Sequence, residues 1–409
     1  MKIALTTLGC KLNYAETSTY ERGFRAAGLE VVAWRQNADL YLVNTCSVTA
    51  TADQKSRSLI RKLHRVNPEA RIVVTGCSAE LRRGEIETIE GVWKVFGCRE
   101  KARVVPECLA GLGLPFEPAL ENAVFGAYST GERTRSFLKV QDGCDNYCNY
   151  CTVPYARGAS RNIPVCECVE MAREIAAQGV KEIVLTGVNT GDFGRTTGES
   201  FLDLLKALNE VDGIERYRIS SIEPNLLSSE IIDWIASGTK FQPHFHIPLQ
   251  TGSDELLKAM GRRYTTAFFA EKLEYIRRAM GDGVFFGIDV MVGLPGETSE
   301  LFDQTVRFLE QIRPAFIHVF PYSRRPGTPA ASMPGQVGEE EKKRRVAVLE
   351  DLCARLHGEF VDLQRGKRVK VLFESKEKDG SMGGYSGNYI RVTRPFDPAL
   401  SGRIVEVEL

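Results

Sequence analysis

Three cysteines within one short stretch are the clearest chemical signal in the sequence. Cys144, Cys148 and Cys151 lie in the run QDGCDNYCNYCTVPYARG, with the spacing CxxxCxxC. Three thiolates on one loop can bind three irons of a cubane iron–sulfur cluster, which leaves the fourth iron without a protein ligand. That open iron can bind a substrate directly, whereas a cluster with four cysteine ligands cannot. The spacing therefore predicts a catalytic cluster rather than an electron-transfer cluster.

A zinc site and a disulfide are the alternatives for this loop. A structural zinc needs four closed ligands, usually in two pairs, and the next thiols, Cys166 and Cys168, are spaced differently. The chain has 11 cysteines, an odd number, and disulfides are rare in the reducing cytosol. Both alternatives are therefore weaker than an iron–sulfur cluster.

A second set of cysteines follows the predicted strands of the N-terminal domain, residues 1–113. Strands are expected at 2–8, 39–44, 71–75 and 92–96, and helices near 14–27, 52–66, 79–90 and 101–112. This alternation predicts an α/β fold with a parallel, doubly wound sheet. A cysteine comes within two residues of each strand end, at Cys10, Cys46, Cys77 and Cys98. Ligands of such sheets bind beyond the carboxyl ends of the strands. Three of these thiolates can therefore converge on a second cluster, and position alone does not exclude Cys98.

The rest of the chain divides into four further segments. Residues 114–134 lack clear periodicity and are expected to be a linker. Residues 135–335 alternate again, with strands at 137–141, 182–186, 216–220, 244–249, 284–292 and 316–320. Six such units predict a partial barrel with its active site in the loops after the strands, where the CxxxCxxC loop stands. A connecting segment over 336–366, helical from 339, leads to a small all-β domain over 367–409.

The composition is that of a folded, water-soluble chain. Of its 409 residues, 43% are hydrophobic and 26% are charged, and the formal net charge is zero. Because the net charge is zero, no overall electric field attracts a nucleic acid, so such a partner must bind to local basic patches. No apolar run approaches the ~18 residues of a membrane span. The start, MKIALTTLGC, mimics a lipoprotein signal but reads better as a first strand, so we expect a cytoplasmic protein, and a monomer.

The motifs resemble those of the radical SAM methylthiotransferases over essentially the whole chain. Three cysteines of the N-terminal domain lie in LGCKLN, NTCSVT and TGCSAE, which match motifs of this family. The resemblance implies that Cys10, Cys46 and Cys77, rather than Cys98, bind an auxiliary cluster. LTGVNTGDFG, SSIEP, HFHIPLQTGSD and GIDVMVGLPGET are similar to family signatures in the barrel. The resemblance implies two 4Fe-4S clusters, with S-adenosylmethionine (SAM) on the open iron of the CxxxCxxC loop, and a C-terminal TRAM domain.

The strings GCKLNYAETS, ADQKSRSLIRK and RISSIEPNLL most resemble the branch that modifies N6-threonylcarbamoyladenosine next to the anticodon of tRNA. Other branches act on N6-isopentenyladenosine in tRNA or on an aspartate of a ribosomal protein. In this family one SAM methylates a sulfur on the auxiliary cluster, and a second yields the 5′-deoxyadenosyl radical that removes hydrogen from adenine C2. The implied partners are the tRNA anticodon stem-loop and an electron donor such as flavodoxin or ferredoxin. A non-catalytic iron–sulfur protein on tRNA is the alternative from a different class.

Residues at the predicted strand ends are the candidates for the SAM pocket. Together with an arginine after the cluster loop, they are Gly187, Asn189, Ser221, Glu223, Gln250, Gly287, Ile288 and Arg157. Glycine permits close backbone approach, and a carboxylate at the mouth of the barrel can bind ribose hydroxyls. Arg157 and Arg161 can contact SAM carboxylate or RNA phosphate, with a loop salt bridge as the alternative.

Basic residues mark one predicted helix of the N-terminal domain and the start of the C-terminal domain. The candidates for RNA binding are Lys55, Arg57, Arg61, Lys62, Arg65, Lys367, Arg368 and Lys370. A solvated surface is the alternative. His244 and His246 share one face of a predicted strand, but no matching carboxylate is evident. We therefore expect them to pack in the barrel rather than to bind a metal.

Overall fold

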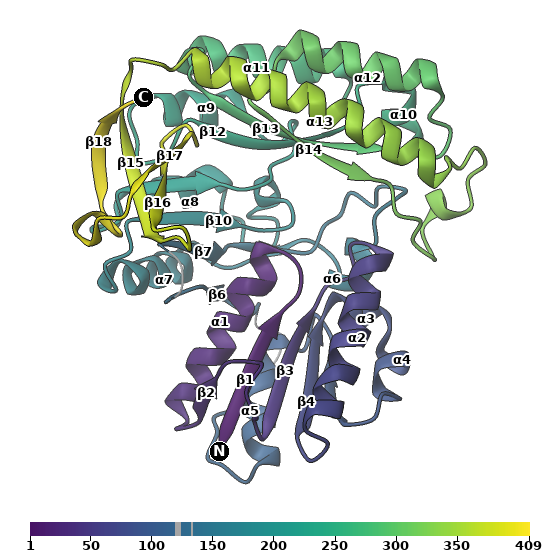
Figure 1. The fold of residues 1–409 in the computed structure, drawn as a ribbon, viewed down its shortest axis with the longest axis vertical. Coiled ribbons are helices and arrows are strands. Elements are labelled where there is room, and N and C mark those ends of the chain that lie inside the picture. Colours follow the sequence, from purple (N-terminus) through teal and green to yellow (C-terminus); the bar gives the residue numbers. More distant parts are fainter. Residues whose placement is uncertain (119–123, 132–133) are drawn as a thin grey trace.

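The computed structural model describes residues 1–118, 124–131 and 134–409, in three parts that follow one another along the chain (Figure 1). The N-terminal part is a five-stranded parallel sheet with the order β2-β1-β3-β4-β5. Its strands are β1 (Lys2–Thr7), β2 (Glu30–Val32), β3 (Leu40–Thr45), β4 (Arg71–Gly76) and β5 (Val92–Phe96). The predicted parallel sheet is confirmed. The prediction missed β2, because three residues are too few to show a periodic pattern.

Helices cover both faces of this sheet. They are α1 (Lys11–Ala26), α2 (Ala50–Val66), α3 (Cys77–Leu81), α4 (Arg83–Glu87), the 3₁₀ turn η1 (Lys101–Arg103) and α5 (Val104–Gly111). Tyr20 and Phe24 of α1 pack with α5 against one face. Ile60 and Leu63 of α2 pack against the other. Each strand that precedes a cysteine thus delivers its thiol to the same edge of the sheet.

The central part holds six parallel strands in two sheets, with the orders β11-β10-β7-β6 and β12-β13-β14; β6 alone runs antiparallel. The strands are β6 (Ala127–Tyr128), β7 (Arg135–Lys139), β10 (Glu182–Thr186), β11 (Arg216–Ile219), β12 (His244–Gln250), β13 (Phe285–Val292) and β14 (Phe316–Pro321), with the short pair β8 (Gln141–Asp142) and β9 (Arg161–Asn162). All six predicted strands are confirmed to within two residues at either end.

The helices of the central part stand between its strands. They are α6 (Val153–Arg157), α7 (Val165–Ala177), η2 (Thr190–Asp192), α8 (Phe201–Asn209), α9 (Ser229–Ala236), α10 (Asp254–Ala259), α11 (Thr266–Met280), α12 (Ser299–Ile312) and η3 (Pro329–Ala331). Four of them, α8, α9, α11 and α12, carry a hydroxyl cap; for example, Ser200 and Asp203 form a capping box at the start of α8. These caps satisfy the first amide groups of each helix and fix where it begins.

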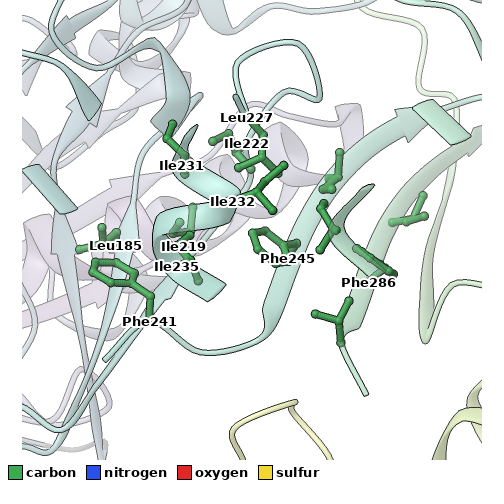
Figure 2. Close-up of a cluster of buried hydrophobic side chains, with 14 of the residues drawn as sticks. Leu185, Ile219, Ile222, Leu227, Ile231, Ile232, Ile235, Phe241, Phe245 and Phe286 are labelled. Carbon is green, nitrogen blue, oxygen red and sulfur yellow. The ribbon is translucent and has the colours of Figure 1, made fainter. Parts of the chain in front are cut away.

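The two central sheets are joined by side-chain packing rather than by a hydrogen-bonded ladder. Between the first three parallel strands and the last three, one isolated bridge pairs Tyr217 with Phe241. Figure 2 shows Ile231, Ile232 and Ile235 of α9 among the side chains at this junction, which are all buried. Each buried isoleucine contributes roughly 1.5–3 kcal/mol, so α9 holds the two sheets together.

The C-terminal part is a long helix followed by a four-stranded antiparallel sheet of order β17-β16-β15-β18. The elements are α13 (Glu339–Asp362), β15 (Arg368–Lys376), β16 (Ser381–Ser386), β17 (Arg391–Pro395), η4 (Pro398–Leu400) and β18 (Ile404–Glu408). The prediction missed β16, whose sequence SMGGYS contains two glycines that weaken a strand signal. Arg216 of β11 donates to the carbonyl groups of Lys370 and Tyr385, which fastens this sheet to the central part.

The predicted linker over 114–134 lies partly outside the described residues. Within its described part, Ala127 and Tyr128 form β6 and pair with β7. Thr19 of α1 accepts a hydrogen bond from the Tyr128 amide. This part of the segment is therefore tied to both domains that it joins.

Candidate active site: two sets of cysteines at one junction

The CxxxCxxC loop lies between β8 and α6, beyond the carboxyl end of β7. Tyr147 adopts a left-handed backbone conformation with φ 46°, which turns the chain between the first two cysteines. The Asn146 amide donates to Sγ of Cys144 at 3.5 Å, and the Val153 amide donates to Sγ of Cys151 at 3.4 Å. Amide–sulfur hydrogen bonds of this kind orient the ligands of iron–sulfur clusters and tune their potential.

Burial raises the pKa of Cys144 to about 11 and that of Cys151 to about 12, and the neighbouring thiols add to both shifts. The three sulfurs therefore lie close enough to repel one another as thiolates. A bound metal ion would reverse these upward pKa shifts, because a thiol that coordinates a metal is deprotonated outright. Three soft donors on one loop fit a 4Fe-4S cluster with one open iron.

Arg262 is a residue of this site that the sequence analysis missed. It stands between α10 and α11, and its Nη1 lies 3.2 Å from Sγ of Cys148. Its other terminal nitrogen forms an ion pair with Glu223. A guanidinium beside a cysteine stabilises the thiolate. Arg262 is 111 or more residues from the loop in sequence, and no local pattern marks it.

The early cysteines gather at the carboxyl edge of the N-terminal sheet. Cys10 is the N-cap of α1, Cys46 directly follows β3, and Cys77 opens α3. Gly9 has φ +117°, and a Cβ there would stand 2.7 Å from Cβ of Cys46, so only glycine allows this approach. Burial raises the pKa of Cys46 to about 11, and the Cys77 and Cys10 thiols add to the shift. Three soft donors thus converge, and they fit a second cluster.

Cys98 also lies at this edge, beside Cys77. The two share an apolar contact with Ala156 of α6. A hydrogen bond from Cys98, together with the nearby Arg157 and Lys101, lowers the pKa of Cys77 to about 6. The same hydrogen bond and burial raise the pKa of Cys98. Both cysteines therefore stand at the edge that the carboxyl-end rule indicates.

A buried ion network lies directly behind Cys77. Nζ of Lys101 is 2.6 Å from both carboxylate oxygens of Glu16, and Nζ of Lys139 is 3.0 Å from one of them. Lys139 and Arg157 also pair with Asp142, at 2.7 and 2.8 Å. Each of the five side chains is at most 3% exposed. Three cations against two carboxylates leave a positive excess next to Cys77, which favours an anionic cluster there.

This network corrects the prediction for Arg157. Its guanidinium is buried, and it donates to Asn13 at 2.6 Å as well as to Asp142. It therefore stands beside the auxiliary cysteines rather than free to bind a SAM carboxylate. Arg161 donates to Asp142 at 3.2 Å and to the carbonyl of Arg157, which is the loop salt bridge foreseen as the alternative.

The two cysteine loops meet at the junction of the N-terminal and central parts. Thr152, next to Cys151, donates to the Ser47 carbonyl, next to Cys46, at 3.4 Å. Helix α3, which begins at Cys77, packs against α6. A buried ion pair between Asp53 of α2 and Arg325, after β14, fastens this junction. A pocket of about 270 Å³ opens beside it, and its lining includes Val48, Thr49, Cys151, Gln250, Asp289 and Met291.

The candidate SAM residues lie in three places: after β10 and β11, at the end of β12, and on β13. Asn189 follows β10, and its Oδ1 accepts from the Glu223 amide at 3.5 Å; Gly187 packs against Gln141. The Ser221 carbonyl accepts from Thr190. Gln250 has φ +73° after a register shift at the end of β12, and it lines the pocket of Cys151. Gly287 lines a different cavity deeper in the central part, and the Ile288 side chain is buried in the core, so only its backbone can contact a ligand.

The structure corrects the reading of the barrel histidines. Nε2 of His246 lies 2.7 Å from a carboxylate oxygen of Asp289, and a nitrogen of His318 falls within 4.8 Å of both. A carboxylate partner therefore exists on the neighbouring strand β13, and no sequence pattern indicated it. His244 packs between Phe285 and Tyr389, as expected.

The basic residues proposed for RNA lie on two separate surfaces. Lys55, Arg61, Lys62 and Arg65 are exposed on α2, whereas Arg57 pairs with Glu85. Lys367, Arg368 and Lys370 are exposed at β15. Helix α2 and strand β15 stand well apart in Figure 1. One continuous basic face is therefore not formed by these residues.

Known proteins match the chain along its whole length. Residues 138–309 match the radical SAM superfamily, and residues 2–97 match uncharacterized protein family UPF0004. The chain is 37% identical to the threonylcarbamoyladenosine tRNA methylthiotransferase MtaB of Bacillus subtilis, over 100% of this chain and 93% of that protein. The chain belongs to the radical SAM methylthiotransferase family. It is also 34% identical to a tRNA-2-methylthio-N(6)-dimethylallyladenosine synthase of Desulfosudis oleivorans, over 95% of this chain and 86% of that protein.

Solved structures confirm the radical SAM fold. The radical S-adenosylmethionine methyltransferase TsrM of Kitasatospora setae superposes with a TM-score of 0.58 at 16% identity, over 81% of this chain and 77% of that one. Similarity at this level establishes the architecture alone. Among the helices of the described residues, none is long and apolar enough to cross a membrane.

Proposed function

We propose that this methylthiotransferase adds a methylthio group to C2 of N6-threonylcarbamoyladenosine next to the anticodon of tRNA. Five of its relatives, at 32–37% identity, bear the name of that activity. The observation that carries the proposal is the junction of the two cysteine loops, where Thr152 reaches Ser47. Two 4Fe-4S clusters with SAM would supply the one-electron chemistry and the sulfur when bound.

The residues of the chain have positioning tasks in this proposal. Cys144, Cys148 and Cys151 would hold one cluster, and Cys10, Cys46 and Cys77 the other. Asn189, Ser221, Glu223 and Gln250 stand at or just after the carboxyl ends of β10, β11 and β12, the edge of the strands that also carries the first loop, and would orient SAM. Arg262 keeps Glu223 in place and adds positive charge beside Cys148. The pocket between the loops would admit the adenine and exclude water.

The finer architecture belongs to the same proposal. We take residues 1–113 as the auxiliary-cluster domain, 114–134 as the linker and 135–335 as the barrel domain. In that domain the two central sheets form the partial barrel of radical SAM enzymes. Residues 336–366 form the connecting helix, and 367–409 a TRAM-like domain. A tRNA substrate places the enzyme in the cytoplasm, where a flavodoxin or ferredoxin would deliver electrons; we propose that it acts as a monomer.

Nucleoside analysis of tRNA from a deletion strain tests the proposed function. We expect the 2-methylthio derivative of N6-threonylcarbamoyladenosine to disappear and the unthiolated nucleoside to accumulate. Loss of the isopentenyladenosine derivative instead would assign the chain to the other tRNA branch. Persistence of both derivatives in a strain without a paralogue would refute the proposal.

The exposed cations of α2 are expected to contact the tRNA backbone. Reversal of Arg61 and Lys62 to glutamate should weaken tRNA binding roughly 10- to 100-fold and lower the salt slope by about two, one for each lost phosphate contact. The measurement is a binding titration at several salt concentrations, with Lys206→Glu on the outer face of α8 as the matched control. An unchanged slope in the double variant would show that this patch is not the contact.

A further inference from the structure

A large cavity lies among the strands of the central part, separate from the pocket that Cys151 lines. Its volume is about 570 Å³, within the range of about 300–1,000 Å³ typical of ligand sites. Strands of both central sheets line it, and Tyr385, Tyr389 and Arg391 of the C-terminal sheet contribute to its wall. Lys11 enters it from the start of α1, the end of that helix nearest the central part in Figure 1. All three parts of the chain thus contribute to one cavity.

Lys11 is the lining cation that has no counter-ion among the described residues. Arg135 pairs with Glu374 at 3.0 Å, Arg218 with Glu182 at 2.8 Å, and Arg391 with Glu377 at 2.6 Å. The Lys11 ammonium makes neither a hydrogen bond nor an ion pair within the described part of the chain. Lys11 is exposed, so its ammonium is open to a group that enters the cavity. An anionic group of a ligand would supply the counter-ion that the described residues do not.

The cavity continues towards the cluster loop along the strands. On β13, Phe285 and Gly287 line the cavity, and Asp289 and Met291, on the same face of the strand, line the pocket of Cys151. His246 lines the cavity and Asp289 lines the pocket, and the two are hydrogen-bonded at 2.7 Å. This polar pair therefore lies where the two spaces approach each other. A group anchored beside Cys151 can therefore extend a side arm towards Lys11.

We propose that this cavity holds the N6 side arm of the substrate base, and that the Lys11 ammonium pairs with its carboxylate. The inference rests on the proposed function, because the threonylcarbamoyl arm ends in a carboxylate. The His244 ring lies 5.2 Å from the Phe285 ring and 4.7 Å from the Tyr389 ring, and together they offer aromatic surface against which the planar urea of the arm can pack.

This geometry makes Lys11 a specificity-determining residue. An isopentenyl arm has no charge, so its entry would leave the ammonium desolvated and unpaired. A charge-assisted hydrogen bond contributes about 10- to 100-fold in affinity. The same lysine therefore favours the acidic arm and disfavours the apolar one.

The test is competitive binding of two free nucleosides, N6-threonylcarbamoyladenosine and N6-isopentenyladenosine, to the reconstituted holoenzyme. We expect the wild type to prefer the first, and Lys11→Met to lose about 10- to 100-fold in affinity for it while its affinity for the second is unchanged or higher. Lys11→Arg should retain most of the preference, and Lys206→Met, on the outer face of α8, should retain all of it. Iron content is measured in each variant to check that the substitution has not disturbed iron binding by the adjacent Cys10.

Two results would overturn the inference. One is an unchanged preference in Lys11→Met. The other is an equal loss of affinity for both nucleosides in Lys11→Met and Lys11→Arg, which would make Lys11 a structural residue. A wild type that transfers no methylthio group to threonylcarbamoyladenosine tRNA refutes the proposed function instead. If the wild type acts on that tRNA and Lys11→Met acts equally well, the inference alone fails.

Discussion

Replacement of Cys148 by alanine is expected to abolish SAM cleavage while the auxiliary irons remain. Cys148 is the buried, middle cysteine of its loop, and Arg262 already holds a positive charge 3.2 Å from its sulfur. Without that thiolate two donors remain, which is too few to hold a cubane with one open corner. Formation of 5′-deoxyadenosine should fall towards the uncatalysed rate, about 10⁶-fold or further below enzymatic rates.

The assay is 5′-deoxyadenosine formation from SAM and dithionite under anaerobic conditions, with iron counted in the same samples. Cys166→Ala is the matched control, because Cys166 is exposed and follows in the same part of the chain. It should leave both readings unchanged. Sustained SAM cleavage by the Cys148 variant would mean that this loop does not carry the catalytic cluster.

Replacement of Glu16 by glutamine is expected to cost about 3–5 kcal/mol of stability, the usual effect of removing one partner from a buried ion pair. Glu16 is fully buried and faces Lys101, Lys139 and Arg157. Its loss leaves those three cations with Asp142 alone. Chemical denaturation measures the change. Glu21→Gln on the same helix is the control, since its exposed pair with Arg25 contributes at most about 1 kcal/mol.

The same residue predicts a dependence of stability on pH. Burial alone would raise the pKa of Glu16, but the three cations outweigh it and lower the pKa to about 2. A carboxyl group whose pKa is lower in the folded state stabilises the fold at a pH above its unfolded pKa. That contribution should be lost as the pH falls from about 4.5 to 2. Unfolding of the wild type and the Glu16 variant should therefore converge at low pH. An equal gap at pH 7 and pH 2 would contradict the network as described.

The sequence predicted the elements and the cysteines well, for local reasons. Strand periodicity is a short-range signal, and the carboxyl-end rule converts it into a shared edge for Cys10, Cys46, Cys77 and Cys98. Among the elements it missed, β2 and β16 are short or rich in glycine. Their pairing is decided by neighbouring strands rather than by their own residues.

The rest of the site depends on contacts between segments far apart in the chain. Arg157 is placed by Glu16 and Asp142, and so a loop arginine predicted to meet a ligand is buried in an ion network instead. The carboxylate that completes His246 comes from Asp289 on the next strand. Lys11 directly follows Cys10 in sequence, yet only the fold shows that it enters a cavity of the central part. No periodic pattern encodes such pairings.

The measurement that tests the account most directly is iron content with spectroscopy on anaerobic protein, wild type against Cys46→Ala. Cys46 lies close to Cys10 and Cys77 but belongs to the other domain from the CxxxCxxC loop. We expect about eight irons in the wild type and about four in the variant, with 5′-deoxyadenosine formation retained. About four irons in both proteins would contradict it, because the early cysteines would then hold no cluster.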